Sequence, residues 1–253
     1  MPAMLSQDRA ESPSDVSARA EAEAYTSRIA AAWEARAGGR MLGVYRIGSL
    51  AHGGFSRRYS DIDMALVMDA GVDAATVEAM RRDAAALSPE LAPKLSLFWT
   101  DRGFVVGRFP PLDRVDYLDH AVALIEREHV MPARPSLADV RAYLGGAPFA
   151  EWAAAARRFA AADDIRAEDH KRYLRALLYP ARFIFSWTTG GVVSNDDAVA
   201  FLSERAPAGL DVGLIERALA CRRADGDLRA LVPARHMLAG QVAACAQLLA
   251  SAR

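Results

Sequence analysis

Cysteine is scarce in this chain, and neither sign of charge dominates. Cys221 and Cys245 are the only cysteines among 253 residues. Their separation matches no metal-binding spacing, so we expect two reduced thiols, as is usual in the cytoplasm. Lysine plus arginine (31) nearly balance aspartate plus glutamate (32), which gives a formal net charge of −1. The chain as a whole therefore has no electrostatic attraction for nucleic acid or for an anionic membrane.

Long hydrophobic runs are also missing. No apolar stretch approaches the roughly 20 residues that a membrane-spanning helix needs. The first residues, MPAMLSQDRAESPSD, lack the apolar centre of a secretory signal peptide. No arginine cluster alternates with aromatic residues in the way typical of nucleic-acid binding. We therefore expect a cytoplasmic protein that has neither a membrane nor a nucleic acid as its partner.

The chain does contain enough apolar material for a sizeable core. Hydrophobic residues make up 52% and charged residues 25%, which is ordinary for a soluble globular protein of one large or two modest domains. Residues 1–13 are polar and predict a disordered tail. Residues 14–38 predict a helix, because Tyr25, Ile29 and Trp33 recur at helical spacing on one face.

Strand and helix patterns divide the rest of the chain in two. In the first part, apolar segments rich in β-branched and aromatic residues predict a small mixed sheet. The predicted strands are 41–47, 62–68, 94–100 and 103–109, and the helix between them is 73–87. After Pro110 and Pro111 the patterns are helical, including the segment 115–128. We therefore predict an α+β fold, with a sheet domain at 14–112 and an all-α helical bundle at 113–253.

One stretch between two predicted strands concentrates polar residues: IGSLAHGGFSRRYSDIDMALVMD, residues 47–69. Because strand side chains alternate, Asp61 and Asp63 share one face and lie about 6–7 Å apart. Two carboxylates this close repel each other unless a cation bridges them. Mg²⁺ prefers oxygen ligands and usually combines one or two carboxylates with substrate phosphates. The pair therefore predicts a magnesium site.

Gly48 and Ser49 follow the preceding strand directly. Because Gly48 has no side chain, backbone N–H groups can approach a phosphate closely, and the Ser49 hydroxyl adds a donor. A phosphate site beside metal-binding carboxylates points to nucleoside triphosphate chemistry, in which the metal neutralises charge while a bond to phosphorus breaks.

The stretch GSLAHGGFSRRYSDIDMALV resembles the signature of the DNA polymerase beta-like nucleotidyltransferase superfamily. Within it, the sequence is most similar to bacterial aminoglycoside adenylyltransferases of the streptomycin and spectinomycin type, which have SDID here and a helical C-terminal domain. The resemblance implies a nucleotidyltransferase domain over 14–112 and magnesium-dependent transfer of AMP from ATP to a hydroxyl of a small molecule, as in antibiotic resistance. The implied site residues are Asp61 and Asp63 for the metal and catalysis, Gly48 and Ser49 for the triphosphate, Ser60 for the nucleotide, and Arg182 for the phosphates.

The sequence departs from this family at three points. The family's third carboxylate, which takes the proton of the acceptor hydroxyl, falls at Ser96, and a serine hydroxyl is a poor base. Asp101, Asp113 and Asp116 are the candidate substitutes. A family lysine that contacts the triphosphate falls at Asn195, and the segment that contributes to acceptor recognition is shorter here.

These departures leave alternatives to the leading hypothesis of an adenylyltransferase with a small hydroxylated acceptor. One alternative is a catalytically degenerate nucleotide-binding or regulatory protein that has kept the fold. Another is a nucleotidyltransferase that modifies a hydroxyl of a partner protein.

Overall fold

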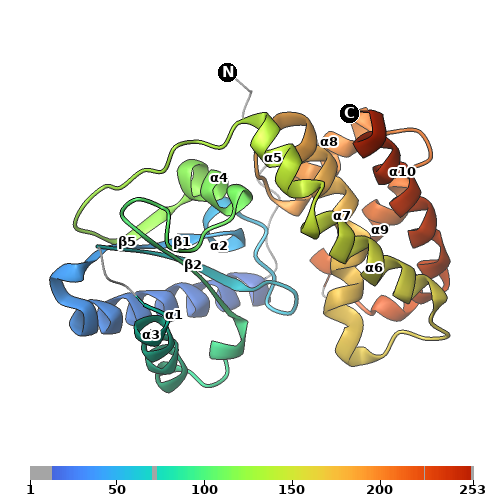
Figure 1. The fold of residues 1–253 in the computed structure, drawn as a ribbon. Helices are drawn as coiled ribbons and strands as arrows, with labels where there is room; N and C mark the ends of the chain where they lie inside the picture. Colours follow the sequence, from blue (N-terminus) through green and yellow to red (C-terminus); the bar gives the residue numbers. More distant parts are fainter. Residues whose placement is uncertain (1–12, 70–72, 225, 252–253) are drawn as a thin grey trace. The chain divides into compact units, whose positions relative to one another are not determined.

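The computed structural model describes residues 13–69, 73–224 and 226–251 (Figure 1). The chain divides into two compact units, Met1–Pro135 and Ser136–Arg253. The predicted disordered tail lies outside the described residues, except for Pro13, with which the first helix begins. No helix in the described part of the chain is both long enough and apolar enough to cross a membrane.

The first unit is built on a mixed five-stranded sheet with the order β4-β3-β2-β1-β5. β2 and β3 run parallel, and the other neighbouring strands are antiparallel. The strands are β1 Met41–Ile47, β2 Ile62–Met68, β3 Leu95–Asp101, β4 Gly107–Arg108 and β5 Val122–Glu126. The bounds of β1 and β2 are those predicted from the sequence, because both strands are apolar runs that end at polar turns.

Two helices, α1 (Pro13–Ala37) and α3 (Ala74–Leu87), cover one face of this sheet, below it in Figure 1. The predicted stripe of α1 is confirmed, since Tyr25, Ile29 and Trp33 are fully buried. Both polar tips of this stripe are satisfied by α3: the Tyr25 hydroxyl donates to the carbonyl of Ala84 at 2.9 Å, and the Trp33 indole N–H donates to Met80 at 2.8 Å. The stripe therefore fixes α3 as well as α1.

The opposite face of the sheet is covered by α4 (Pro111–His120) and a cluster of aromatic rings. Tyr117 of α4 packs edge-on against Tyr45 of β1, with ring centroids 4.9 Å apart. The other rings of the cluster are Phe98, Phe104 and Phe109. Edge-to-face contacts of this kind stabilise a small core beyond the area that they bury.

The segment after α4 corrects the sequence-based prediction. The structure ends α4 at His120 and forms β5, which pairs antiparallel with β1, where a single helix over 115–128 was predicted. The short apolar run before Glu126 is compatible with either a helix or a strand, and only the free edge of β1 decides between them. The first compact unit extends to Pro135, whereas the sequence placed the domain boundary after residue 112.

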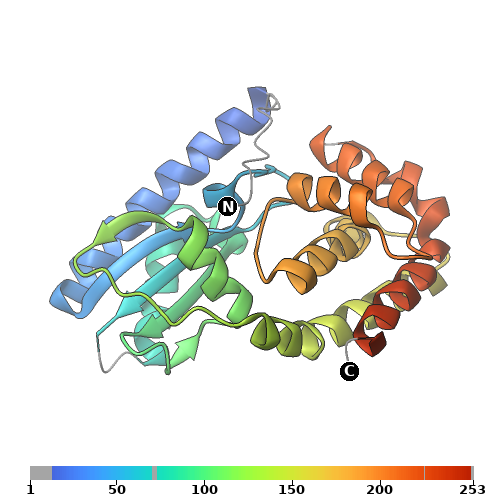
Figure 2. The ribbon, with the colours of Figure 1, turned by 90° about the horizontal axis from the view of Figure 1, so that it is seen from above.

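The described residues of the second unit form helices joined by loops, with no strand, as predicted. Its α-helices are α5 Leu137–Leu144, α6 Ala147–Ala161, α7 His170–Thr189, α8 Asn195–Arg205, α9 Val212–Arg223 and α10 Leu238–Ser251, and its longest 3-10 segment is Leu228–Met237. Figure 2 shows α7 among the helices that it contacts, α5, α6, α8, α9 and α10. Because α7 packs on so many neighbours, most of its residues are buried, including Tyr173, Phe183 and Trp187.

Candidate functional site

The predicted site residues of the first unit gather where β1 ends and β2 begins. β1 ends at Ile47, which pairs with Asp63 of β2. Gly48 caps the short helix α2 (Ser49–His52), and the loop after α2 returns to Asp61 at the start of β2. The antiparallel pairing therefore places the Gly-Ser turn and the two aspartates at the same end of the sheet.

The predicted alternation along β2 is confirmed by its two core clusters. Ile62 and Met64 pack beneath α1 and α3, whereas Ala65 and Val67 pack beneath α4. Asp63 is in phase with the second set and is partly exposed. Its carboxylate is thus on the side of the sheet that α4 covers.

Gly48 is in direct contact with Asp63. Its backbone angles, φ 65° and ψ −154°, belong to a region that residues with a side chain rarely adopt. A side-chain carbon at this position would lie 3.0 Å from Asp63 Cβ and Cγ, and closer still to Oδ2. Glycine is therefore required here for two reasons, the backbone conformation and the space that Asp63 occupies.

The amide of Gly48 has a partner that the sequence did not indicate. It donates a hydrogen bond of 2.6 Å to Oδ2 of Asp116, a buried residue of α4. We predicted that the amides of this turn face a phosphate, but in this structure the Gly48 N–H is engaged by a carboxylate. The two residues are 68 positions apart, so no local pattern could indicate this contact.

Two serines connect the beginning and end of the loop. Ser49 Oγ donates to Ser60 Oγ at 3.2 Å. The Ser60 hydroxyl also accepts the amide of Ser56 at 2.9 Å, and the Ser60 amide donates to the carbonyl of Ser56 at 3.0 Å. Ser60 is buried and Ser49 is partly exposed. Ser60 therefore shapes the loop, and Ser49 presents the more accessible hydroxyl of the pair.

Ser96 lies directly beside Asp63, because the two residues pair in the parallel ladder of β2 and β3. The position expected to carry a third carboxylate is thus next to the aspartate pair, and it is a serine. Asp101 does not replace it. It ends β3 about 16 Å further along the strand and accepts the amides of Val105 and Val106 at 2.9 and 3.1 Å. The Val105 amide, first among these donors, holds the pKa of Asp101 below its usual value.

The remaining residues implied by the family resemblance belong to the second unit. Arg182 is an exposed residue of α7, and Asn195 is the first residue of α8. The predicted contact of Arg182 with nucleotide phosphates stays a prediction.

The carboxylates at this end of the sheet suit a metal that is shared with a substrate. Within the described residues, no group of three or more histidine, cysteine, aspartate or glutamate side chains could hold a metal ion. Asp61 and Asp63 are both partly exposed and offer carboxylate oxygens. Such a pair fits Mg²⁺, which commonly completes its coordination with water and substrate phosphate oxygens.

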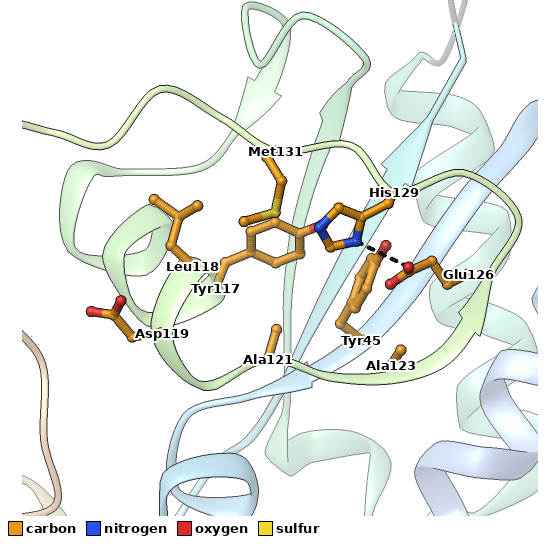
Figure 3. A pocket seen from close by; sticks show the side chains of 9 residues that line it. All are labelled: Tyr45, Tyr117, Leu118, Asp119, Ala121, Ala123, Glu126, His129 and Met131. Carbon is orange, nitrogen blue, oxygen red and sulfur yellow. Dashed lines mark hydrogen bonds and ion pairs between the residues drawn. The ribbon is translucent and has the colours of Figure 1, made fainter.

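A separate pocket of about 130 Å³ lies beside the C-terminal half of α4 in the same unit (Figure 3). The side chain of His129 forms a 3.0 Å contact with Glu126 at its rim. Burial raises the pKa of Tyr45 and Tyr117, so both phenols stay neutral at physiological pH. The lining residues are Tyr45, Tyr117, Leu118, Asp119, Ala121, Ala123, Glu126, His129 and Met131. None of the predicted nucleotide or metal residues lines this pocket.

The sequence matches no protein-family profile and no curated protein. Among solved structures, the chain is similar to the spectinomycin adenyltransferase AAD(9) from Enterococcus faecialis, whose structure was determined with ATP and spectinomycin. The match has a TM-score of 0.64 and covers 90% of this chain and 99% of the other, at 12% sequence identity. The chain therefore has a nucleotidyltransferase-like α+β fold, with a mixed five-stranded sheet and flanking helices in its first unit and a helical second unit.

Proposed function

We propose that this protein is a magnesium-dependent nucleotidyltransferase that transfers a nucleoside monophosphate, AMP from ATP, to a hydroxyl of a small molecule. The observation that carries the proposal is the contact of Gly48 with Asp63, which joins the Gly-Ser turn to the aspartate pair. The structural similarity to an adenyltransferase that was solved with ATP supports the same class of reaction.

Each residue has a defined part in this proposal. Asp61 and Asp63 bind the ion, and the Ser49 hydroxyl turns from Ser60 to donate to a phosphate oxygen. Arg182 keeps the phosphate-binding role that the family resemblance implies. Bound Mg²⁺ would neutralise the charge that develops on the phosphates. Most of the catalysis would come from positioning and charge compensation, as is typical of phosphoryl transfer.

The direct test incubates the protein with ATP, magnesium and a panel of hydroxylated acceptors that includes spectinomycin and streptomycin. Pyrophosphate release and the mass of the acceptor are measured. We expect one acceptor to gain the mass of AMP, with Asp63→Asn inactive under the same conditions. Acceptor-dependent turnover that persisted in Asp63→Asn would refute the proposal.

One observation favours a second candidate, a protein that binds nucleotide without efficient transfer. Ser96 stands beside Asp63 where a general base is expected, and general bases contribute about 10²–10⁴-fold to a rate. In that case the protein binds magnesium–ATP but transfers AMP slowly or not at all.

Replacing Ser96 by glutamate distinguishes the two candidates. If the site lacks a base, Ser96→Glu is expected to raise AMP transfer by about 10²-fold, because the new carboxylate can take the acceptor proton beside Asp63. The matched control is Ser96→Gln, which has the same size and no basic group. Equal rates in wild type, Ser96→Glu and Ser96→Gln would mean that the native site already has its base elsewhere.

A further inference from the structure

Asp116 is held rigidly by the residues on either side of it in α4. Val115 is fully buried, and the Tyr117 hydroxyl donates to the carbonyl of Val130 at 2.9 Å. Arg114 donates from Nε to the carbonyl of Phe109 and from Nη2 to that of Phe104, both at 2.8 Å. These contacts fix the rotation of α4, and with it the direction in which the Asp116 side chain leaves the helix.

The Asp116 carboxylate binds a backbone group of the candidate site. Its Oδ2 accepts the Gly48 amide at 2.6 Å, and the residue is only 5% exposed. A hydrogen bond between an amide and a buried carboxylate is short and stronger than one between neutral groups. The bond therefore holds the peptide that joins Ile47 to Gly48 in one orientation.

The same glycine is in contact with Asp63 on another side. Gly48 thus lies between two carboxylates. Asp116 binds its amide, and Asp63 occupies the space that a side chain at Gly48 would need. Because φ at Gly48 is 65°, an extended or helical relaxation of this residue would move Ser49 relative to Asp63. The amide bond to Asp116 opposes that relaxation.

We propose that Asp116 is a positioning residue, which holds Gly48 so that Ser49 and Asp63 face one nucleotide together. The inference rests on the proposed function for the identity of the ligand. It assigns Asp116 neither as a metal ligand nor as the missing base. The described residues contain no three-carboxylate metal group, and the Asp116 oxygen that faces the turn is already bound to the Gly48 amide.

The first measurement follows Gly48 itself by NMR in protein labelled with ¹⁵N-glycine. The variants are Asp116→Asn, which keeps an acceptor oxygen of the same size, and Asp116→Ala, which removes it. Asp119→Asn is the matched control, because Asp119 is an exposed residue of α4 that pairs with Arg134. We expect the Gly48 amide resonance to move upfield and its hydrogen exchange to accelerate in the order wild type, Asn, Ala, with no change in the control.

The second measurement is the affinity of the same proteins for a non-hydrolysable ATP analogue with magnesium. We expect affinity to fall on the order of tenfold in Asp116→Ala and less in Asp116→Asn, as for loss of a hydrogen bond to a charged group. An unchanged Gly48 resonance in Asp116→Ala would overturn the inference, and so would a shifted resonance with wild-type affinity. Asp116→Asn serves for both readouts if Asp116→Ala does not fold. A wild-type protein that bound no nucleotide would instead refute the proposed function, while the Gly48 resonance would still report on the contact with Asp116.

Discussion

Replacing Asp63 by asparagine is expected to abolish most magnesium-dependent ATP binding. Asparagine keeps the shape of the side chain in contact with Gly48 but removes the negative charge from one of two carboxylates. Even outer partners of metal ligands are worth about 10–100-fold in metal affinity, so we expect a loss of at least 100-fold for Asp63→Asn. The measurement is isothermal titration with a non-hydrolysable ATP analogue, with magnesium and with EDTA.

The titration in EDTA provides an internal comparison. Without the metal, Asp63→Asn is expected to bind the analogue no worse than wild type, because a carboxylate repels a triphosphate. Asp69→Asn is the matched control just beyond the end of β2, since Asp69 is partly exposed and pairs with Arg102. If Asp63→Asn and Asp69→Asn bound magnesium–ATP equally well, the metal role of Asp63 would be wrong.

Replacing Gly48 by alanine is the second change with a large expected effect. The alanine side chain would carry the cost of a glycine-only backbone conformation, about 1–3 kcal/mol, and would also overlap Asp63. Overpacking adds about 1–3 kcal/mol, so we expect Gly48→Ala to lower the free energy of unfolding by about 3 kcal/mol or more. Affinity for magnesium–ATP should fall as well, because Asp63 has to move.

Gly53, at the other end of α2, separates the two contributions. It has φ 93° and ψ 173°, again a conformation that favours glycine, but a side-chain carbon there would meet no atom within 4 Å. Gly53→Ala should therefore show the backbone cost without the overlap. Urea denaturation of both variants measures the difference. Equal losses of stability in the two variants would show that overlap with Asp63 adds nothing to the cost of replacing Gly48.

The parts of the fold that were predictable are those specified by local patterns. β1 and β2 begin and end where their apolar runs do, and the helical stripe of Tyr25, Ile29 and Trp33 is buried as its spacing indicated. The alternation of side chains along β2 correctly predicted the face of the sheet on which Asp63 lies. The position of Ser96 beside Asp63 followed from the alignment of the third predicted strand with the family pattern.

The features that the sequence did not reveal depend on contacts between distant segments. β5 is a strand because β1 has a free edge beside it, which the residues of β5 do not encode alone. Asp116 was only one of several candidate acids until the fold brought it to Gly48. The extent of the first unit likewise depends on a contact between distant segments, since the segment 122–126 joins its sheet beside β1.

The late position of α4 and β5 in the chain also bears on biosynthesis. A ribosome releases β1, the Gly-Ser turn and β2 well before it makes the strand that protects the open edge of β1. Asp116, which accepts the Gly48 amide, is synthesised with that same segment. The nascent chain therefore gains the fifth strand of the sheet and the bond that holds the turn from the same segment. A nascent chain that stalled before residue 116 would expose the edge of β1 to aggregation.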